Sequence, residues 1–403
     1  MRISIDATAV PLNPTGVGRF VIELAHALSK YQDLSIDLLV RKNDSQDWQI
    51  DVPTAAEESS AGVHTHYLAP KKRLLRLGWE QVGLPRLLKS LNTDVHHSPH
   101  YTVPLLSKSA IAVTVHDLIF FDYPQWYQTS KVLLLRAALY GAVYKADAVV
   151  CDSKYTADRL LKLCSKQDGR AYGLDRLLSG LESKLESRLY VVHLGVDTSR
   201  FTPIEPFFGY DDAQLKTLGV KPPYIAFVGM VEPRKDVPTL VKAFGMIQKQ
   251  FKDLTLVIAG LKGWGSAEEE FRRALNSLSE PDRVKRLGYI PNEAVVSLLR
   301  KASAVVYPSL AEGFGLPALE ALSCGAPLIT TRGSAMEEVG LDAALLVDPG
   351  NVQQLSQAIE SVVADSSDKP LLSERTKRGL DIAQSHSWDA CARGYMEIYR
   401  KLS

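Results

Sequence analysis

The sequence predicts an α/β protein built from two doubly wound domains. The chain has 403 residues, which exceeds one ordinary hydrophobic core and suits two α/β domains. Short apolar runs alternate with helical segments along its whole length. Several of these runs are continuously apolar, as expected for parallel strands covered on both faces. We therefore expect two parallel sheets with right-handed crossovers.

The composition narrows the class of protein. Apolar residues make up 46% and charged residues 23% of the chain, which are globular values. The net charge of +1 argues against nucleic acid as the main partner. The cysteines show no Cys-x-x-Cys spacing, so neither a disulfide framework nor a zinc site is indicated. They are Cys151, Cys164, Cys324 and Cys391.

The first residues do not read as a secretory signal. The most apolar long segment, 132–150, contains charged residues and is expected to form a helix and a strand instead of a membrane span. A cytoplasmic location is the simplest expectation.

The first domain is expected to begin with a strand at 2–10 and a helix that ends near Leu28. Between them lies the pair Gly16 and Gly18, at a strand-to-helix turn that suits an anion or a close backbone contact. A dinucleotide fingerprint would place a third glycine where Val21 stands. The pair therefore fits either a ligand contact or a simple glycine turn.

Strands follow at 35–40 and 64–68, with a polar loop at 42–60. The segment 71–79 then mixes four cations with leucines and a tryptophan. Such a segment can rest on anionic lipid headgroups, or it can be a helix that packs its leucines inward. Both interpretations stay open at this point.

Histidines gather at the ends of two predicted strands. His96, His97 and His100 have no carboxylate or cysteine at a recognised metal spacing, so we interpret them as a polar acceptor rim. His116 and Asp117 directly follow the apolar strand at 110–115. The carboxyl ends of parallel strands are where open α/β sheets bind ligands. His116 is thus a candidate ligand contact, the alternative being a core histidine, and Asp117 is a candidate for orienting it or the acceptor.

The rest of the first half continues the alternation. A helix at 129–144, a strand at 148–153 and a closing strand and loop at 190–197 are expected. The segment 165–188 carries leucines at helical spacing, so we expect an added amphipathic helix. This helix could cover its own domain, pair with another subunit or lie on a membrane. We assign the first domain to 1–200 and the interdomain linker to 201–222.

The second domain is assigned to 223–387, and the final helix, 388–403, is expected to return to the first domain. Its first strand, 224–228, leads into Gly229 and then the adjacent cations Arg234 and Lys235. Two cations before a helix suit a diphosphate, and they could stabilise charge on a leaving group. A surface salt bridge is the alternative for this pair. The remaining strands are expected at 254–259, 284–290, 304–307, 327–331 and 343–348, with a helix from residue 352.

The stretch 312–320 is the most informative part of the sequence. It follows an apolar strand, carries two glycines, and leads into a helix with Pro317 in its first turn. Such a helix start binds anions. If the segment were helical throughout, Glu312 and Glu320 would lie roughly 12 Å apart, which exceeds the separation of about 5 to 9.5 Å in glycosidase carboxylate pairs. They fit better as acceptors for sugar hydroxyls at the two ends of a diphosphate. The alternative is a solvated loop residue and a helix-surface charge.

The motif that runs from Glu312 to Glu320, followed by Ala321, Gly325 and Pro327, resembles family 4 of the retaining glycosyltransferases. The resemblance covers nearly the whole chain. It implies the GT-B fold, in which two Rossmann-like domains face each other across a cleft, with the nucleotide held mainly by the second domain and the acceptor mainly by the first.

The resemblance also implies roles for individual residues. Glu312 would bind the transferred sugar and Glu320 the ribose, while His116 would contact the sugar. Lys235 matches the family's phosphate-binding lysine; relatives commonly carry an arginine where Met230 stands, and Arg234 is expected to take that role. The remaining donor-binding residues would be Gly16, Gly18, Gly229, Gly288, Tyr289, Ile290, Gly313, Phe314, Gly315 and Leu316.

The implied reaction moves a hexose from a nucleoside-diphosphate sugar to a hydroxyl of a glycan or lipid-linked acceptor, with retained configuration and with no metal or other cofactor. The segments 115–118 and 232–235 are similar to bacterial mannosyltransferases of surface-polysaccharide assembly, which favours GDP-mannose. The alternatives are a UDP-hexose transferase for glucose or N-acetylglucosamine, a nucleotide-sugar-binding scaffold without turnover, and a pyridoxal-phosphate phosphorylase whose cofactor lysine is not identifiable. Peripheral contact with the inner face of the plasma membrane through 71–79 is one of the two open interpretations of that segment, and the sequence does not define an oligomeric state.

Overall fold

The computed structural model describes residues 1–10, 16–42, 62–165, 180–365 and 374–403. The chain forms two compact units. Unit 1 comprises Met1–Leu194 and Trp388–Ser403, and unit 2 comprises Gly195–Ser387.

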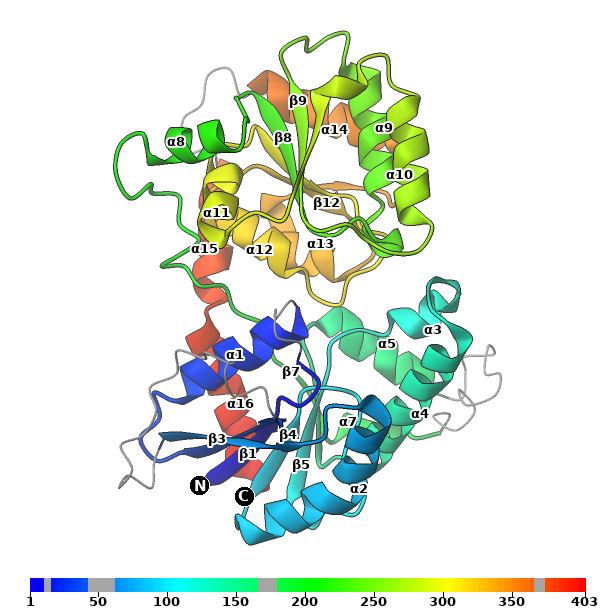
Figure 1. Ribbon diagram of the computed structural model, residues 1–403, viewed down its shortest axis with the longest axis vertical. Coiled ribbons are helices and arrows are strands. Elements are labelled where there is room, and N and C mark those ends of the chain that lie inside the picture. Colours follow the sequence, from blue (N-terminus) through cyan, green and yellow to red (C-terminus); the bar gives the residue numbers. More distant parts are fainter. Residues whose placement is uncertain (11–15, 43–61, 166–179, 366–373) are drawn as a thin grey trace. The chain divides into compact units, whose positions relative to one another are not determined.

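The described part of unit 1 is built on a seven-stranded sheet in the order β3-β2-β1-β4-β5-β6-β7 (Figure 1). All its neighbouring strands are parallel, with Ile3 of β1 opposite Ile36 of β2. The strands are β1 (Arg2–Asp6), β2 (Ser35–Arg41), β3 (Gly62–Ala69), β4 (Val95–Ser98), β5 (Ala110–Val115), β6 (Ala148–Cys151) and β7 (Leu189–Val191). This order reverses direction between β1 and β4, which is where doubly wound sheets bind ligands.

The helices of unit 1 cover this sheet. They are α1 (Val17–Leu28), α2 (Arg73–Ser90), α3 (Ile119–Asp122), α4 (Thr129–Lys145), α5 (Lys154–Cys164), α7 (Glu182–Glu186) and α16 (Trp388–Leu402). Helix α1 buries Phe20, Val21 and Leu24 at helical spacing. The Phe20 ring lies 5.8 Å from the Tyr395 ring of α16, so the last helix of the chain packs on the first.

Unit 2 contains a six-stranded parallel sheet in the order β10-β9-β8-β11-β12-β13. Its strands are β8 (Tyr224–Val228), β9 (Thr255–Ala259), β10 (Val284–Gly288), β11 (Ala304–Tyr307), β12 (Leu328–Thr331) and β13 (Leu345–Val347). Four of them, β8, β9, β11 and β12, bury nearly every residue, and the first three read as continuous apolar runs for this reason.

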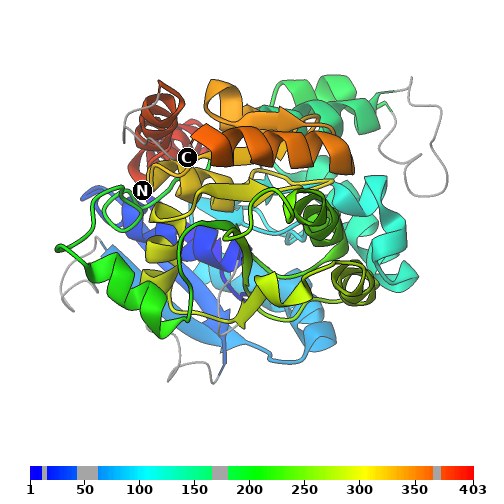
Figure 2. The same ribbon diagram turned by 90° about the horizontal axis from the view of Figure 1, so that it is seen from above.

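Helices cover both faces of the second sheet. They are α8 (Tyr210–Thr217), α9 (Val237–Ile247), α10 (Ala267–Asn276), α11 (Asn292–Arg300), α12 (Leu316–Ser323), α13 (Ala335–Gly340), α14 (Val352–Asp365) and α15 (Glu374–Ser385). Helices α9 and α10 lie side by side on one face, where α14 also packs against α9 (Figures 1 and 2). Helices α11 and α12 lie on the opposite face (Figure 1).

Two sequence predictions differ from these elements. The first strand ends at Asp6 and not at residue 10. The predicted linker, 201–222, contains α8 and belongs to unit 2. Asp211 of α8 is buried and accepts a hydrogen bond of 2.7 Å from Ser297, and it also pairs with Arg300 at 3.2 Å. A charge buried with its partner fixes this segment to the domain, since leaving that partner unpaired would be costly.

Two predicted segments lie wholly or partly outside the described residues. The loop expected at 42–60 falls almost entirely in 43–61, and the core of the added helix falls in 166–179. Helix α7, in the described part of this segment, buries Leu185 in the unit 1 core and packs Leu181 against it. This part of the segment covers its own domain.

Helix α2 does not bury all the leucines of the 71–79 segment. Leu74 is 82% exposed and Leu75 is 61% exposed, so the interpretation in which the leucines pack inward is wrong for these two side chains. No helix in the described ranges is both long enough and apolar enough to cross a membrane.

Candidate functional site

The motif of residues 312–320 lies at the carboxyl end of β11, where the chain turns into α12. Gly315 precedes the helix with φ of +109°, a value that L side chains rarely adopt. A Cβ atom at Gly315 would lie 2.4 Å from the Met336 sulfur, so only glycine fits. Pro317 occupies the first turn, and Phe314 is buried. The predicted strand, glycine loop and helix start are therefore present.

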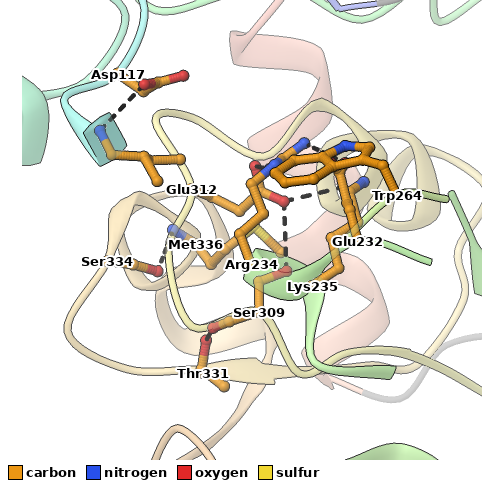
Figure 3. Close-up of polar contacts among 11 residues, drawn as sticks. Asp117, Glu232, Arg234, Lys235, Trp264, Ser309, Glu312, Thr331, Ser334 and Met336 are labelled. Carbon is orange, nitrogen blue, oxygen red and sulfur yellow. Dashed lines mark hydrogen bonds and ion pairs between the residues drawn. The ribbon is translucent and has the colours of Figure 1, made fainter. Parts of the chain in front are cut away.

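Glu312 is held at this loop by cations from a second loop (Figure 3). Its Oε2 atom is paired with Nη1 of Arg234, its Oε1 atom lies 4.0 Å from the Lys235 amine, and the Ser309 hydroxyl donates to Oε1 at 3.3 Å. Burial opposes ionisation of Glu312, but Arg234 and Lys235 outweigh it and lower its pKa. Glu312 is therefore an ionised hydrogen-bond acceptor, and the solvated-loop interpretation is wrong.

Arg234 connects two carboxylates instead of extending into solvent. Its Nη2 atom donates to Glu232 at 2.8 Å while Nη1 binds Glu312. Glu232 also accepts a hydrogen bond of 3.1 Å from the indole of Trp264 (Figure 3). These side chains are largely buried, which excludes the surface salt bridge. The sequence did not single out Glu232 as a site residue, although it lies within the 232–235 segment that carries the resemblance.

Lys235 is buried behind Arg234 and packs against Gly229. A Cβ atom at Gly229, whose φ is +150°, would lie 2.8 Å from the Lys235 nitrogen. Burial lowers the pKa of Lys235, and the nearby charge of Glu312 opposes this effect. Because the amine carries its charge at a desolvation cost, an incoming anion would be bound strongly there.

Glu320 lies on the inner side of α12 and is only 5% exposed, so the helix-surface interpretation is wrong. The negative charge of Glu320 acts to raise the pKa of Lys235, against the larger effect of burial. Burial and the charge of Glu320 also raise the pKa of Tyr307. Glu312 and Glu320 therefore both interact electrostatically with the buried amine of Lys235.

Tight glycine contacts join the carboxyl ends of the neighbouring strands β8, β9 and β10. The Gly229 amide donates to Ala259 at 2.8 Å, and the Gly260 amide donates to Gly288 at 2.7 Å. After β10, Ile290 is buried while Tyr289 is 72% exposed. Of these two predicted donor contacts, the Tyr289 side chain is the accessible one.

In unit 1, the structure gives His116 a partner that the sequence analysis missed. Its Nδ1 atom lies 2.5 Å from the Asp152 carboxylate, and its Nε2 atom donates to the Pro99 carbonyl at 3.1 Å. Burial lowers the pKa of His116, but the Asp152 charge reverses this, and the net pKa is raised. Both ring nitrogens therefore face acceptors, as the imidazolium form requires.

Asp152 follows β6, just as His116 follows β5, and these two strands are neighbours in the sheet. This shared position at strand ends is the signal that could have predicted the pair. The Asp117 carboxylate accepts a hydrogen bond of 3.1 Å from the Ile119 amide (Figure 3), and its charge also raises the pKa of His116.

The other histidines and the first glycine pair have different environments. His97 is a core residue, bonded at 2.8 Å to Thr114 and at 2.8 Å to Tyr399, so it is not part of an acceptor rim. His96 is also fully buried and bonds Ser4 at 2.8 Å. Gly16 precedes α1 with φ of +51°, and Gly18 is buried in its first turn.

The described residues contain no group of three or more histidine, cysteine, aspartate or glutamate side chains that could hold a metal ion. The cysteines are buried and free; they are Cys151, Cys164, Cys324 and Cys391.

Comparison with known families defines the class of protein. A model described as "Glycosyltransferase Family 4" matches residues 14–170, and one described as "Glycosyl transferases group 1" matches residues 212–379. With the two parallel sheets, these matches show that the chain belongs to the GT-B glycosyltransferases of the family 4 type. The expected fold class and family are thus confirmed.

Individual relatives are similar over different shares of the chain. The O-antigen chain mannosyltransferase B of Escherichia coli is 26% identical to this chain, and the match covers 100% of both chains. A D-inositol 3-phosphate glycosyltransferase of Kribbella flavida is 29% identical over 60% of this chain and 56% of its own.

Solved structures with low sequence identity share the fold. Sucrose-phosphate synthase from Thermosynechococcus elongatus has a TM-score of 0.74 at 20% identity, covering 100% of this chain and 99% of its own. Anabaena HepE in complex with UDP and glucose has a TM-score of 0.70 at 17% identity, with both chains fully covered.

Replacement of Gly315 should distort the 312–320 motif. Gly315→Ala combines a left-handed backbone with the close approach of Met336, so we expect a loss of about 2–4 kcal/mol in the free energy of unfolding. Gly333→Ala is the matched control, because Gly333 has φ of +75° but open space around its Cβ position. Urea unfolding of both variants checks this. Equal losses would show that the Met336 contact does not constrain the motif.

Replacement of Asp152 should make stability less dependent on the charge of His116. The raised pKa means that the folded state holds the His116 proton more tightly than the unfolded state. This stabilisation is fully present below the unfolded pKa of about 6.5 and is lost as the pH rises through the folded pKa. Asp152→Asn should therefore lower the free energy of unfolding by about 3 kcal/mol at pH 6 and by less at pH 9.

The control for this measurement is Asp117→Asn. Asp117 also raises the pKa of His116, but less than Asp152 does, so its effect between pH 6 and pH 9 should be smaller. Urea unfolding at both pH values checks the pair. The same loss at pH 6 and pH 9 for Asp152→Asn would contradict a charged His116.

Proposed function

We propose that this chain is a retaining hexosyltransferase that takes its sugar from a nucleoside diphosphate, with GDP-mannose as the first donor to test. The observation that carries this proposal is the buried network of Glu312, Arg234 and Lys235 beside the start of α12. The donor has a polar group at each end and a charged diphosphate between them. The network offers acceptors and cations in the same small region.

Two features of this region favour binding of a diphosphate. The first amides of α12 have no partners within the helix, and they favour anions. Lys235 adds a buried positive charge at the Gly229 turn. When the bond to the sugar breaks, charge builds on the leaving diphosphate, and fixed cations in a dry site stabilise that charge.

Arg234 can exchange partners as the donor binds. In the described state, its guanidinium neutralises Glu232 and Glu312. Glu312 would accept hydrogen bonds from sugar hydroxyls, and the diphosphate would take over part of the guanidinium charge. Arg234 would in this way supply the arginine that relatives carry at the position of Met230.

Retention is supported by the state of the carboxylates in unit 2. Glu312 and Glu232 are both ion-paired with Arg234, which makes each a weak nucleophile. In a same-face reaction, the bond between the sugar carbon and the phosphate oxygen breaks while the acceptor oxygen bonds to that carbon. The acceptor proton passes to the leaving phosphate oxygen. No metal is required if Arg234, Lys235 and the helix start neutralise the diphosphate.

The choice of donor rests on relatives. The similarity to a protein called a mannosyltransferase supports mannose. A UDP-hexose is the second candidate, since Anabaena HepE was solved with UDP-glucose, although at 18% identity that likeness concerns the fold. A scaffold without turnover is the third, and its support is Met230 in place of the family's arginine.

The reaction is tested with purified protein and a panel of GDP-mannose, UDP-glucose and UDP-N-acetylglucosamine. We expect transfer from GDP-mannose, an α-linked product by NMR, and unchanged rates with EDTA. Preference for a UDP-sugar would replace the donor, and an inverted product would exclude retention. Binding without turnover of any donor would support the scaffold.

The two motif glutamates should differ in their kinetic effects. Glu312→Ala removes the sugar contact and leaves Arg234 with one carboxylate, so kcat should fall at least about 100-fold. Glu320→Ala should raise the donor KM by about tenfold with a smaller change in kcat. Glu374→Gln, on the exposed surface of α15, is the control. Steady-state kinetics check this, and small, equal effects of both substitutions would contradict the assigned roles.

We also propose that the protein is cytoplasmic and touches the inner face of the plasma membrane through a basic-apolar segment, defined as Lys71, Lys72, Arg73, Leu74 and Leu75. All five residues are exposed. The cations complement anionic headgroups, and the two leucines can enter the interface. A lipid-linked acceptor would be met at such a surface.

The membrane proposal is tested by sedimentation with vesicles that contain phosphatidylglycerol. Replacing Lys71 and Lys72 by Glu should weaken binding at least about tenfold, because each cation near the surface contributes about 1 kcal/mol. Replacing Lys249 and Lys252, which are exposed in unit 2, changes the net charge equally and is the control. Equal losses in both pairs would show nonspecific attraction and no docking segment.

A further inference from the structure

Helix α2 holds a buried acid that the proposed reaction does not use. Glu80 is 2% exposed, and neither of its carboxylate oxygens has a hydrogen-bond partner in the described structure. The Thr102 hydroxyl is close enough to lower its pKa but does not form a hydrogen bond of normal geometry. A buried carboxyl without partners is costly, so its presence calls for an explanation.

The charges around Glu80 do not compensate it. Asp6, the last residue of β1, is also buried and adds a second negative charge. Arg76 on the same helix directs its guanidinium to the Thr8 hydroxyl at 3.2 Å. Burial and Asp6 raise the pKa of Glu80 to about 7, against smaller opposing effects of Thr102 and Arg76. At neutral pH this carboxyl can thus both donate and accept hydrogen bonds.

Other unsatisfied polar atoms lie at the same edge of the sheet. Four buried atoms without partners belong to β4, to the loop that follows it, or to the residue after β6. They are His96 Nε2, Ser98 Oγ, His100 Nε2 and Asp152 Oδ1. The negative charge of Asp6 acts to raise the pKa of His96 and His100 as well as that of Glu80. Such a group of unused donors and acceptors at the β1–β4 reversal suits a ligand with several hydroxyls.

Helix α2 is held firmly beside Glu80, and several side chains near this carboxyl are only partly buried. The neighbouring Gln81 fixes α2 to the loop after β4, because its amide donates to Val103 at 3.0 Å and accepts from the Leu105 amide at 3.0 Å. Arg76, His100 and Thr102 are only partly buried. Polar side chains with access to solvent therefore surround the region in front of the carboxyl.

Building on the proposed function, we propose that Glu80 binds a hydroxyl group of the acceptor sugar and selects a neutral glycoside over a phosphorylated acceptor. A hydroxyl supplies the hydrogen-bond partner that both carboxylate oxygens lack. A phosphate would be repelled by Glu80 and Asp6 together. This selectivity would separate the chain from its relatives named D-inositol 3-phosphate glycosyltransferase.

The test compares Glu80→Gln with wild type, using octyl α-D-mannopyranoside and D-inositol 3-phosphate as acceptor probes. The amide keeps the shape but loses the charge, so the KM for the octyl mannoside should rise about tenfold. The donor KM and the slow hydrolysis of donor without acceptor should change less than about twofold. Wild type should not use D-inositol 3-phosphate. An unchanged acceptor KM, or a wild type that prefers the phosphorylated probe, overturns the proposal.

Stability provides a second readout that a purely structural role would not give. The raised pKa of Glu80 means that the folded state loses stability as the pH rises from about 4.5 through about 7. Glu80→Gln removes this loss, so the variant should melt at a higher temperature than wild type at pH 8, with a smaller gain at pH 5. A variant less stable than wild type at pH 8 would show that Glu80 supports the fold, which also overturns the proposal.

Thr93→Val is the matched control. Thr93 also has a buried hydroxyl oxygen without a partner in unit 1, but it lies before β4, at the opposite edge of the sheet. Its replacement should leave acceptor kinetics unchanged. If wild type transfers to no acceptor and hydrolyses no donor, the proposed function fails, and the melting measurements then decide the role of Glu80 alone. If wild type transfers and Glu80→Gln matches it, only the present inference fails.

Discussion

The site in unit 2 depends on the pairing of buried charge around one guanidinium. Arg234 joins Glu232 to Glu312, and Glu312 in turn lies beside the amine of Lys235. Removing Arg234 would leave the buried Glu232 carboxylate without its cationic partner, which is strongly destabilising. The loops after β8 and β11 are therefore fixed to each other, and the Leu310 amide donating to the Arg234 carbonyl at 2.7 Å adds a backbone link. A site held this way is preorganised before any ligand arrives, so little binding energy is spent on ordering it.

The same architectural rule places polar groups in both units. Parallel strands bring their carboxyl ends to one edge, and the residues that follow them meet there whatever their distance in the sequence. In unit 1, His116 meets Asp152, and in unit 2, Arg234 meets Glu312. The outcome differs because the charges differ. The unit 2 groups neutralise one another, whereas Glu80 and Asp6 lie together as like charges. This contrast supports the two different ligands that we propose, a diphosphate in unit 2 and hydroxyl groups in unit 1.

Local patterns made much of this predictable from the sequence. The strands are short apolar runs, and the 312–320 motif combines a glycine with positive φ, a proline and a helix start within a few residues. The fold class and the family followed from these features. What the sequence could not supply were pairings across the sheet. Asp152 and Glu232 acquire their roles only because β6 lies beside β5 and because the loop after β8 folds against Glu312. Helix α8 was missed for a similar reason, since Asp211 is fixed there by Ser297 and Arg300 from a later helix.

Helix α2 joins two parts of the proposed function in one element. Its first turn and the residues before it expose Lys71, Lys72 and Leu74 to solvent, while Glu80, two turns later, is directed into the unit. At 1.5 Å per residue, the axial rise from Leu74 to Glu80 is roughly 9 Å. A lipid-linked sugar held at the exposed segment would thus need to reach only about one sugar length to meet the buried carboxyl. Gln81 fixes α2 to the loop after β4, so the proposed docking at one end and the proposed acceptor binding at the other would share one rigid support. The exposed leucines and the unsatisfied acid, each unfavourable in the isolated protein, are both explained if the acceptor arrives from a membrane surface.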